Sequence, residues 1–303
     1  MLKNILPSSI YSNIKNIPYN SLCELRLRSE DNVVVNINGE NYYLCNNTFS
    51  KNSNDSITLS NGEIQSIISK ISNNSLYTIN DQLIDGYATI DGGIRVGVSG
   101  EVVSVNGCIK TIKNISSLNF RFPHFIKNCS LNIYPYIVSN GNIKNTLIIS
   151  PPGAGKTTYL RDLIYQISNR ENLLNILVID ERNEITCVFD GENFIKLKNI
   201  DVYSNCTKKF AFNNGIRSMK PDVIFTDEIN IDKDLDDIEN ALTCGVKIIS
   251  TIHAYNINDL KNKQSFFRII DKRLFDRFVV LSNDNGVGTL DGIYNENLKL
   301  LGV

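Results

Sequence analysis

SPPGAGKTTYLRDL, residues 150–163, holds a glycine-rich turn that ends in Lys-Thr, and its flanks show where this turn lies in a fold. The apolar run Thr146–Ile149 before it is short and follows Asn145, which is typical of a buried parallel strand. After the turn, apolar side chains recur at helical spacing and form one face: Tyr159, Leu160, Leu163, Ile164 and Ile167. We therefore predict a strand, a phosphate-binding loop and a helix, in that order.

The turn matches the pattern G-x-x-x-x-G-K-[ST], except that Ser150 stands where the first Gly is expected. Gly153 and Gly155 let the backbone curl, so that its N–H groups and the positive end of the helix converge on a β-phosphate. We expect Lys156 to reach the β- and γ-phosphates and the Thr157 hydroxyl to bind Mg²⁺. The predicted nucleotide-binding residues are Pro152, Gly153, Ala154, Gly155, Lys156, Thr157 and Thr158.

A second apolar strand, VIFT at residues 223–226, is followed directly by Asp227 and Glu228. Carboxylates at the end of a parallel strand lie in the crevice beside the phosphate loop. We expect Asp227 to hold Mg²⁺ through water and Glu228 to polarise the attacking water. An apolar run ending in Asp-Glu is a weak signal alone, and its place downstream of a phosphate loop strengthens it.

Two further apolar runs end in polar residues that can reach the same edge of a sheet. The run 176–179 leads into an acidic segment, in which either Glu181 or Glu184 could assist the water or bind metal; a solvated acidic turn is an equal alternative. The run 246–251 leads to His253, which could sense the γ-phosphate. A lone histidine is more often structural, but this one follows a third strand of the same predicted sheet, so we favour a functional role.

Charge that develops on a transferred phosphoryl group needs more cations than the loop and its lysine supply. Arg95 and Arg121, both upstream of the phosphate loop, are candidates, as is Arg217; Arg182 is a less clear one. A surface salt bridge is the default explanation for any one of them. We predict that Arg95 or Arg121 acts in trans, on the nucleotide site of a neighbouring subunit.

The 303 residues are enough for two domains, and the 42% hydrophobic content is that of a soluble globular protein. We predict a smaller α+β domain at 1–121, a connector at 122–145, and an α/β domain at 146–303 whose parallel sheet is flanked by helices. A net charge of −1 gives no electrostatic footprint for nucleic acid, and seven cysteines without CxxC spacing indicate neither disulfides nor zinc. No signal peptide and no membrane span is expected.

Several segments together resemble the stage III sporulation protein AA family, within the wider group of secretion-type ATPases with a RecA-like core. In order along the chain they are GGIRVGVSGE, IKNISSLNFRF, SPPGAGKTTYLRDL, VIDERNEI, DVYSNCTKKFAFNNGIRSMKPDVIFTDEI and STIHA. Two positions depart from the family pattern, Ser150 and Asn230, each in place of Gly. Neither departure removes a charged group.

The resemblance implies a P-loop ATPase that uses ATP and Mg²⁺ and assembles into a ring, expected to be a hexamer. It would lie in the cytoplasm of the mother cell of a spore-forming bacterium, docked on integral membrane proteins of a channel that links mother cell and forespore. Secretion-type ATPases complete their sites with arginines of the N-terminal domain, as predicted above for Arg95 or Arg121. No nucleic-acid partner is expected.

Two alternatives belong to other classes. A RecA-like nucleic-acid motor would need a basic, aromatic-bearing loop along its path, and the balanced charge argues against one. A small-molecule kinase would need an arginine-rich lid after the core helices. The segment 256–277 carries only Arg268, Arg273 and Arg277 on what we expect to be one long amphipathic helix.

Overall fold

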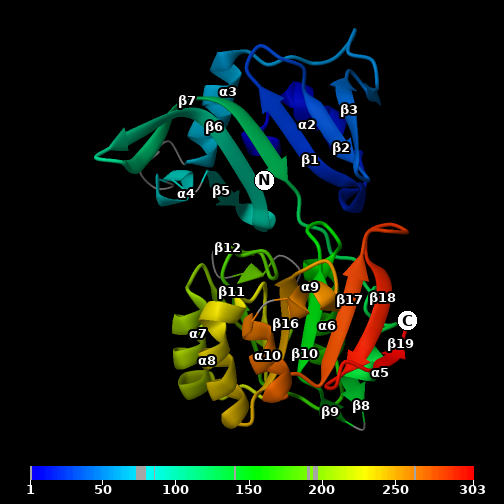
Figure 1. Ribbon diagram of the computed structural model, residues 1–303. Coiled ribbons are helices and arrows are strands. Elements are labelled where there is room, and N and C mark those ends of the chain that lie inside the picture. Colours follow the sequence, from blue (N-terminus) through cyan, green and yellow to red (C-terminus); the bar gives the residue numbers. More distant parts are fainter. Residues whose placement is uncertain are drawn as a thin grey trace. The chain divides into compact units, whose positions relative to one another are not determined.

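The computed structural model describes residues 2–72, 80–84, 86–139, 141–189, 192–193, 197–262 and 264–303, and the chain forms two compact units (Figure 1). The first unit comprises Met1–His124 together with Phe189–Phe194. The second comprises Phe125–Val188 and Ile195–Val303. Each unit has its own sheet and its own buried apolar core.

The first unit is built on a seven-stranded antiparallel sheet with the order β4-β3-β2-β1-β7-β6-β5. The strands are β1 (Leu22–Arg28), β2 (Val34–Ile37), β3 (Glu40–Cys45), β4 (Thr48–Ser50), β5 (Tyr87–Ile90), β6 (Ile94–Val105) and β7 (Cys108–Arg121). The turn between β2 and β3 has φ values of 51° at Asn38 and 90° at Gly39. The dipeptide Asn38-Gly39 between the apolar runs 33–37 and 42–44 predicts a hairpin with a type I′ turn, and positive φ at both central residues confirms it.

The helices of this unit are α1 (Leu2–Ile5), α2 (Ser8–Ile14), α3 (Asn61–Ile71) and α4 (Asn80–Ile84), with short 3₁₀ turns at Tyr19–Ser21 and Asp91–Gly93. The spacing of Ile5, Ile10, Ile14 and Ile17 predicts one short helix over residues 1–18, but the structure divides it at Pro7, whose ring cannot continue a helix from the preceding turn. The sequence also predicts a helix over residues 78–87. Tyr87 begins β5 instead, and residues 78, 79 and 85 lie outside the described part of the chain.

The second unit is built on an eight-stranded mixed sheet with the order β14-β11-β15-β16-β10-β17-β18-β19. Its strands are β10 (Thr146–Ser150), β11 (Ile176–Asp180), β14 (Ile200–Ser204), β15 (Val223–Thr226), β16 (Lys247–His253), β17 (Arg277–Ser282), β18 (Thr289–Asn295) and β19 (Leu300–Gly302). All neighbours from β14 to β17 pair in parallel, and β18 and β19 add antiparallel strands. The apolar runs 146–149, 176–179, 223–226, 246–251 and 277–282 predict five strands, and all five are present as β10, β11, β15, β16 and β17, whereas β14, β18 and β19 were not predicted.

Helices cover both faces of this sheet (Figure 1). α6 (Lys156–Ser168) packs on β10 and β16 over one core cluster. α7 (Lys208–Met219) and α8 (Ile231–Thr243) cover the other face over a second cluster, against β11 and β16. The remaining short elements are α5 (Tyr134–Ile137), β8 (Val138–Ser139), β9 (Asn142–Ile143), β12 (Val188–Phe189), β13 (Glu192–Asn193), α9 (Ile257–Lys261) and α10 (Gln264–Asp271).

The prediction of one long helix over residues 256–277 was wrong. Two short helices lie there, α9 and α10, and α10 ends before Arg273, which has the left-handed φ of 49°. Arg268 does not project into a lid, because it pairs at 2.6 Å with both Asp236 and Glu239 of α8. Arg268 therefore connects α10 to α8. An arginine that is paired in this way does not provide the arginine-rich lid of a kinase.

Candidate functional site

The predicted phosphate-binding loop connects the end of β10 to the start of α6, so its place between a strand and a helix is confirmed. Gly153 and Gly155 have φ values of 74° and 84°, a region that side chains disfavour, and Gly155 is the N-cap of α6. A Cβ atom at Gly155 would lie 3.5 Å from Val287 and 3.7 Å from Gly288, which is ordinary van der Waals contact. Glycine is therefore needed here for its backbone conformation, and it leaves the first backbone N–H groups of α6 available for an anion.

Lys156 is the first residue of α6 and is half-buried. Its Nζ donates to the carbonyl oxygens of Ser150 at 3.2 Å and Pro151 at 3.4 Å, so the ammonium lies on the loop itself. Burial lowers the pKa of Lys156, while the charges of Glu228 and Glu184 act in the opposite direction. The lysine of the loop is thus influenced by the charges of two carboxylates, which lie in the segments after β11 and β15.

Asp227 and Glu228 follow β15 directly, but their environments differ. Asp227 is buried with 8% of its surface exposed, and Glu228 is exposed. Burial raises the pKa of Asp227 to about 6; Lys208 opposes this shift, and the charges of Asp180 and Glu181 add to it. One carboxylate of the pair is therefore held in the protein, and the other is available to solvent and to a ligand.

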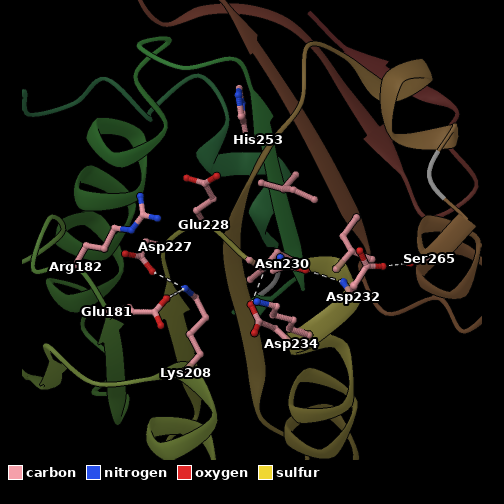
Figure 2. A pocket seen from close by; sticks show the side chains of 14 residues that line it. Glu181, Arg182, Lys208, Asp227, Glu228, Asn230, Asp232, Asp234, His253 and Ser265 are labelled. Atoms are coloured by element: carbon pink, nitrogen blue, oxygen red, sulfur yellow. Dashed lines mark hydrogen bonds and ion pairs between the residues drawn. The ribbon is translucent and has the colours of Figure 1, made fainter. Parts of the chain in front are cut away.

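Lys208, the first residue of α7, lies between two of the predicted carboxylates (Figure 2). Its Nζ is 2.7 Å from Oε2 of Glu181 and 3.1 Å from Oδ1 of Asp227. Burial disfavours its charged form, but Asp227 and Glu181 outweigh burial and raise the pKa of Lys208. Sequence reasoning missed this residue. The available signal was a lysine at the first position of a helix, where a cation is disfavoured.

The three acidic residues at the end of β11 and directly after it, Asp180, Glu181 and Glu184, make different contacts. Asp180 is fully buried, and its carboxylate accepts from the backbone N–H groups of Glu184 at 2.7 Å and Thr186 at 2.8 Å, so it shapes the turn. Glu181 pairs with Lys208. Glu184 is the member of this segment whose charge acts on Lys156. The two candidates that the sequence left open, Glu181 and Glu184, thus face different cations.

His253 ends β16, directly opposite Ser150 in the parallel register with β10. Its Nδ1 lies 3.2 Å from the carbonyl oxygen of Ser150, the same atom that accepts from Lys156.

Ser150 itself is the last residue of an extended strand, so a side chain is tolerated there. Asn230 has a φ of −98°, and its side chain caps α8 by accepting from the N–H of Asp232 at 3.0 Å. Neither departure from the family pattern strains the backbone.

A hollow of about 850 Å³ opens beside these residues (Figure 2). Glu181, Asp227, Glu228 and His253 line it together with Lys208. In the second unit, the structure therefore brings Glu181, Asp227, Glu228 and His253 to one place, at the carboxyl ends of β11, β15 and β16, whereas Glu184 and the predicted nucleotide-binding residues 152–158 do not line this hollow.

The family of the chain follows from a sequence comparison. The profile of the family described as "Sporulation stage III, protein AA" matches residues 2–301. The chain belongs to this family. It is 34% identical over 307 residues to "Stage III sporulation protein AA" of Bacillus subtilis (strain 168), across 99% of this chain and 96% of that protein.

Solved structures share the two-domain fold of this sporulation stage III protein AA family member. The ATPase DotB of Yersinia pseudotuberculosis has a TM-score of 0.63 at 13% identity, over 95% of this chain and 79% of that chain. The pilus retraction motor PilT with bound ADP has a TM-score of 0.54 at 18% identity, over 90% of this chain and 78% of that chain. At such low identities the likeness shows the fold alone.

The two N-terminal arginines of this sporulation-family protein lie opposite each other on neighbouring strands, since Arg95 of β6 pairs with Arg121 of β7 in the antiparallel register. The residues next to them, Val96 and Phe120, are completely buried in the core, so both arginines lie on the other face of the sheet. The Arg95 guanidinium lies 4.1 Å from the centre of the Tyr87 ring. Sequence reasoning had named the two arginines separately, and the register places them together.

The remaining arginine candidates lie in the second unit. Arg182 lines the hollow beside Asp227. Arg217 lies in the last turn of α7, whereas Lys208 at the first residue of that helix contacts the site. Arg217 follows Lys208 by nine residues, which is roughly 14 Å along the helix axis, so the two side chains start from opposite ends of α7.

Proposed function

We propose that this protein is a Mg²⁺-dependent ATPase with a RecA-like core, which works as a ring-forming motor of the secretion type. The observation that carries the proposal is the position of Lys156, which begins α6 directly after a glycine turn with two positive φ values and whose ammonium lies on that turn. Membership in the sporulation family and the fold shared with DotB and PilT support the same function.

The residues of the site fit Mg²⁺. Thr157 offers a hydroxyl in the first turn of α6, and Asp227 offers a carboxylate at the end of β15. Oxygen ligands from one or two side chains, completed by phosphates and water, are what Mg²⁺ prefers in nucleotide sites. When bound, the ion would neutralise charge on the β- and γ-phosphate oxygens.

The protein's own side chains would then do the following. Lys156 exchanges its hydrogen bonds to Ser150 and Pro151 for bonds to the phosphates, so the loop holds the lysine ready at a position close to its working one. Glu228, which is exposed beside the buried Asp227, polarises the attacking water. Glu184 is the second carboxylate that can reach this water, because its charge also acts on Lys156.

His253 connects the γ-phosphate end of the site to the rest of the sheet. It shares the carbonyl oxygen of Ser150 with Lys156, so a movement of the lysine toward phosphate removes a neighbour of the imidazole. A group that changes partners when the lysine moves can report the presence of nucleotide to β16. This is the role that we assign to His253.

Arg95 and Arg121 would complete the site in trans, from the N-terminal domain of a neighbouring subunit. Their placement opposite each other on one face of a sheet would present two guanidinium groups on rigid strands. An arginine supplied in this way is worth about 10³ to 10⁵ in rate. The requirement for such a neighbour is the physical reason for a ring, which we expect to be a hexamer.

The partners and the location are part of the same proposal. In the described part of the chain, no helix is long and apolar enough to cross a membrane. We expect the protein to lie in the mother-cell cytoplasm and to dock on integral membrane proteins of the channel between mother cell and forespore, in line with its family. Nucleic acid is not an expected partner.

The proposal is tested by nucleotide binding and assembly of the purified full-length protein. We expect a fluorescent ATP analogue to bind in the presence of Mg²⁺, and sedimentation to show a shift from small species to one ring-sized species when ATP is added. Lys156→Ala should weaken binding, because it removes the cation that faces the phosphates. Binding of the analogue that is unchanged in Lys156→Ala would mean that the loop is not the nucleotide site.

A further inference from the structure

Lys208 is a buried ammonium that connects the ends of two strands. Its side chain is 6% exposed, and it contacts Glu181 after β11 at 2.7 Å and Asp227 after β15 at 3.1 Å. The contact with Asp227 reaches the residue that we expect to bind the metal. The contact with Glu181 reaches a carboxylate that is 41% exposed at the rim of the hollow.

The position of this lysine contradicts two local preferences. The first turn of a helix disfavours a cation because the helix dipole is positive there, and Lys208 is the first residue of α7 after the Thr207 cap. Burial of an ammonium also costs several kcal/mol before its partners are counted. An apolar side chain of the same length would fill this space at less cost, so packing alone does not explain a lysine.

The negative charges around Lys208 explain the presence of a lysine better than packing does. Asp180 is fully buried at the end of β11, and Glu181 and Asp227 directly follow β11 and β15, which are neighbouring strands, so three carboxylates gather at one edge of the sheet. Within the described residues, Lys208 forms ion pairs with two of them, at 2.7 Å to Glu181 and 3.1 Å to Asp227. A nucleotide would bring several further negative charges to the same edge of the sheet.

We propose that Lys208 is a positioning residue of the ATPase, which holds the Asp227 and Glu181 carboxylates in one fixed arrangement beside the phosphate-binding loop. The inference rests on the proposed ATPase function. Lys208 does not touch the reacting atoms; it acts through Asp227 and is itself oriented by Glu181. Its effect is expected on the rate of the chemical step and not on the affinity for nucleotide, which Lys156 and the backbone of the loop supply.

The first test replaces the charge while it keeps the length of the side chain. In Lys208→Met we expect kcat to fall by a factor on the order of 10², as for loss of other preorganised charges. The KM for ATP and the Kd of a fluorescent ATP analogue should stay within about threefold of the control. The matched control is Lys209→Met, since Lys209 is the next residue of α7 and is exposed.

The second test asks whether the lysine and Glu181 act as one unit. Glu181→Gln alone should lower kcat about tenfold, and the double variant should be no slower than Lys208→Met, because the glutamate acts only through the lysine. Multiplied losses in the double variant would contradict the proposal, since Glu181 would then act independently. If Lys208→Met fails to fold by its thermal unfolding curve, Glu181→Gln decides, and a wild-type kcat in that variant overturns the inference.

The outcomes separate this inference from the proposed function. If the wild-type protein hydrolyses no ATP, the proposed function fails. If the wild-type protein is active and Lys208→Met has the same kcat as Lys209→Met, only the role of Lys208 fails. An equal loss of kcat and of analogue binding in Lys208→Met would also overturn the role, because the lysine would then support the whole site.

Discussion

Asp227→Asn should make the folded protein more stable and at the same time abolish its ATPase activity. The pKa of this buried carboxyl group is raised from its usual 3.8 to about 6, mainly by burial. A carboxyl group whose pKa rises on folding favours the folded state only while it is protonated. Its contribution is therefore lost as the pH rises from about 4 to about 6.

The size of the effect follows from the same two values. At roughly 1.4 kcal/mol for each pH unit, the ionised Asp227 costs about 3 kcal/mol of unfolding free energy at pH 7.5. Asparagine has the same shape and no charge, so Asp227→Asn should recover most of this amount. The gain should shrink to about 1 kcal/mol at pH 4.5, where Asp227 is protonated in the folded state.

Chemical unfolding of the wild-type and variant proteins at both pH values measures this gain. The control is Asp201→Asn, because Asp201 is an exposed carboxylate of β14 and should show no gain. A variant that is less stable than wild type at pH 7.5, or a gain that does not depend on pH, would refute the reasoning that burial strains Asp227.

Two further predictions concern the reaction. Glu228→Gln should bind ATP and hydrolyse it at least about 10²-fold more slowly, since the attacking water loses its polarising carboxylate. Single-turnover assays measure this rate. If they show that Glu184→Gln is inactive and Glu228→Gln is active, the base belongs to the segment after β11. Arg95→Ala or Arg121→Ala subunits should be inactive alone, and mixing them with Lys156→Ala subunits should restore part of the phosphate release by rebuilding some intact composite sites. Wild-type turnover in both arginine variants that still assemble would limit the N-terminal domain to docking.

The parts of the fold that the sequence predicts well are those with strong local signals. Strands β10 and β11 are buried at every residue, so they contain the continuous apolar runs 147–149 and 176–179 in the sequence. The Asn38-Gly39 turn requires positive φ at two successive residues, and few dipeptides allow this. By contrast, β14 is a half-buried edge strand with the mixed sequence Ile-Asp-Val-Tyr-Ser, and only its pairing with β11 identifies it.

In the candidate site, too, some residues have a local sequence signal and others do not. The position of the predicted phosphate loop between a strand and a helix, and that of the Asp-Glu pair directly after β15, could be predicted because both depend on neighbours in sequence. Asp180 belongs to the acidic segment, and the backbone N–H groups of the turn that follows it bind its oxygens. Lys208 contacts residues after two different strands, which no local pattern indicates.

The most direct test of the account is steady-state phosphate release from ATP by the purified full-length protein, compared with the variant Lys156→Ala. The account predicts Mg²⁺-dependent release by the wild-type protein under conditions where it assembles, and no release above background by Lys156→Ala. Release at the same rate by both proteins would contradict it, as would a correctly assembled wild-type ring that releases no phosphate.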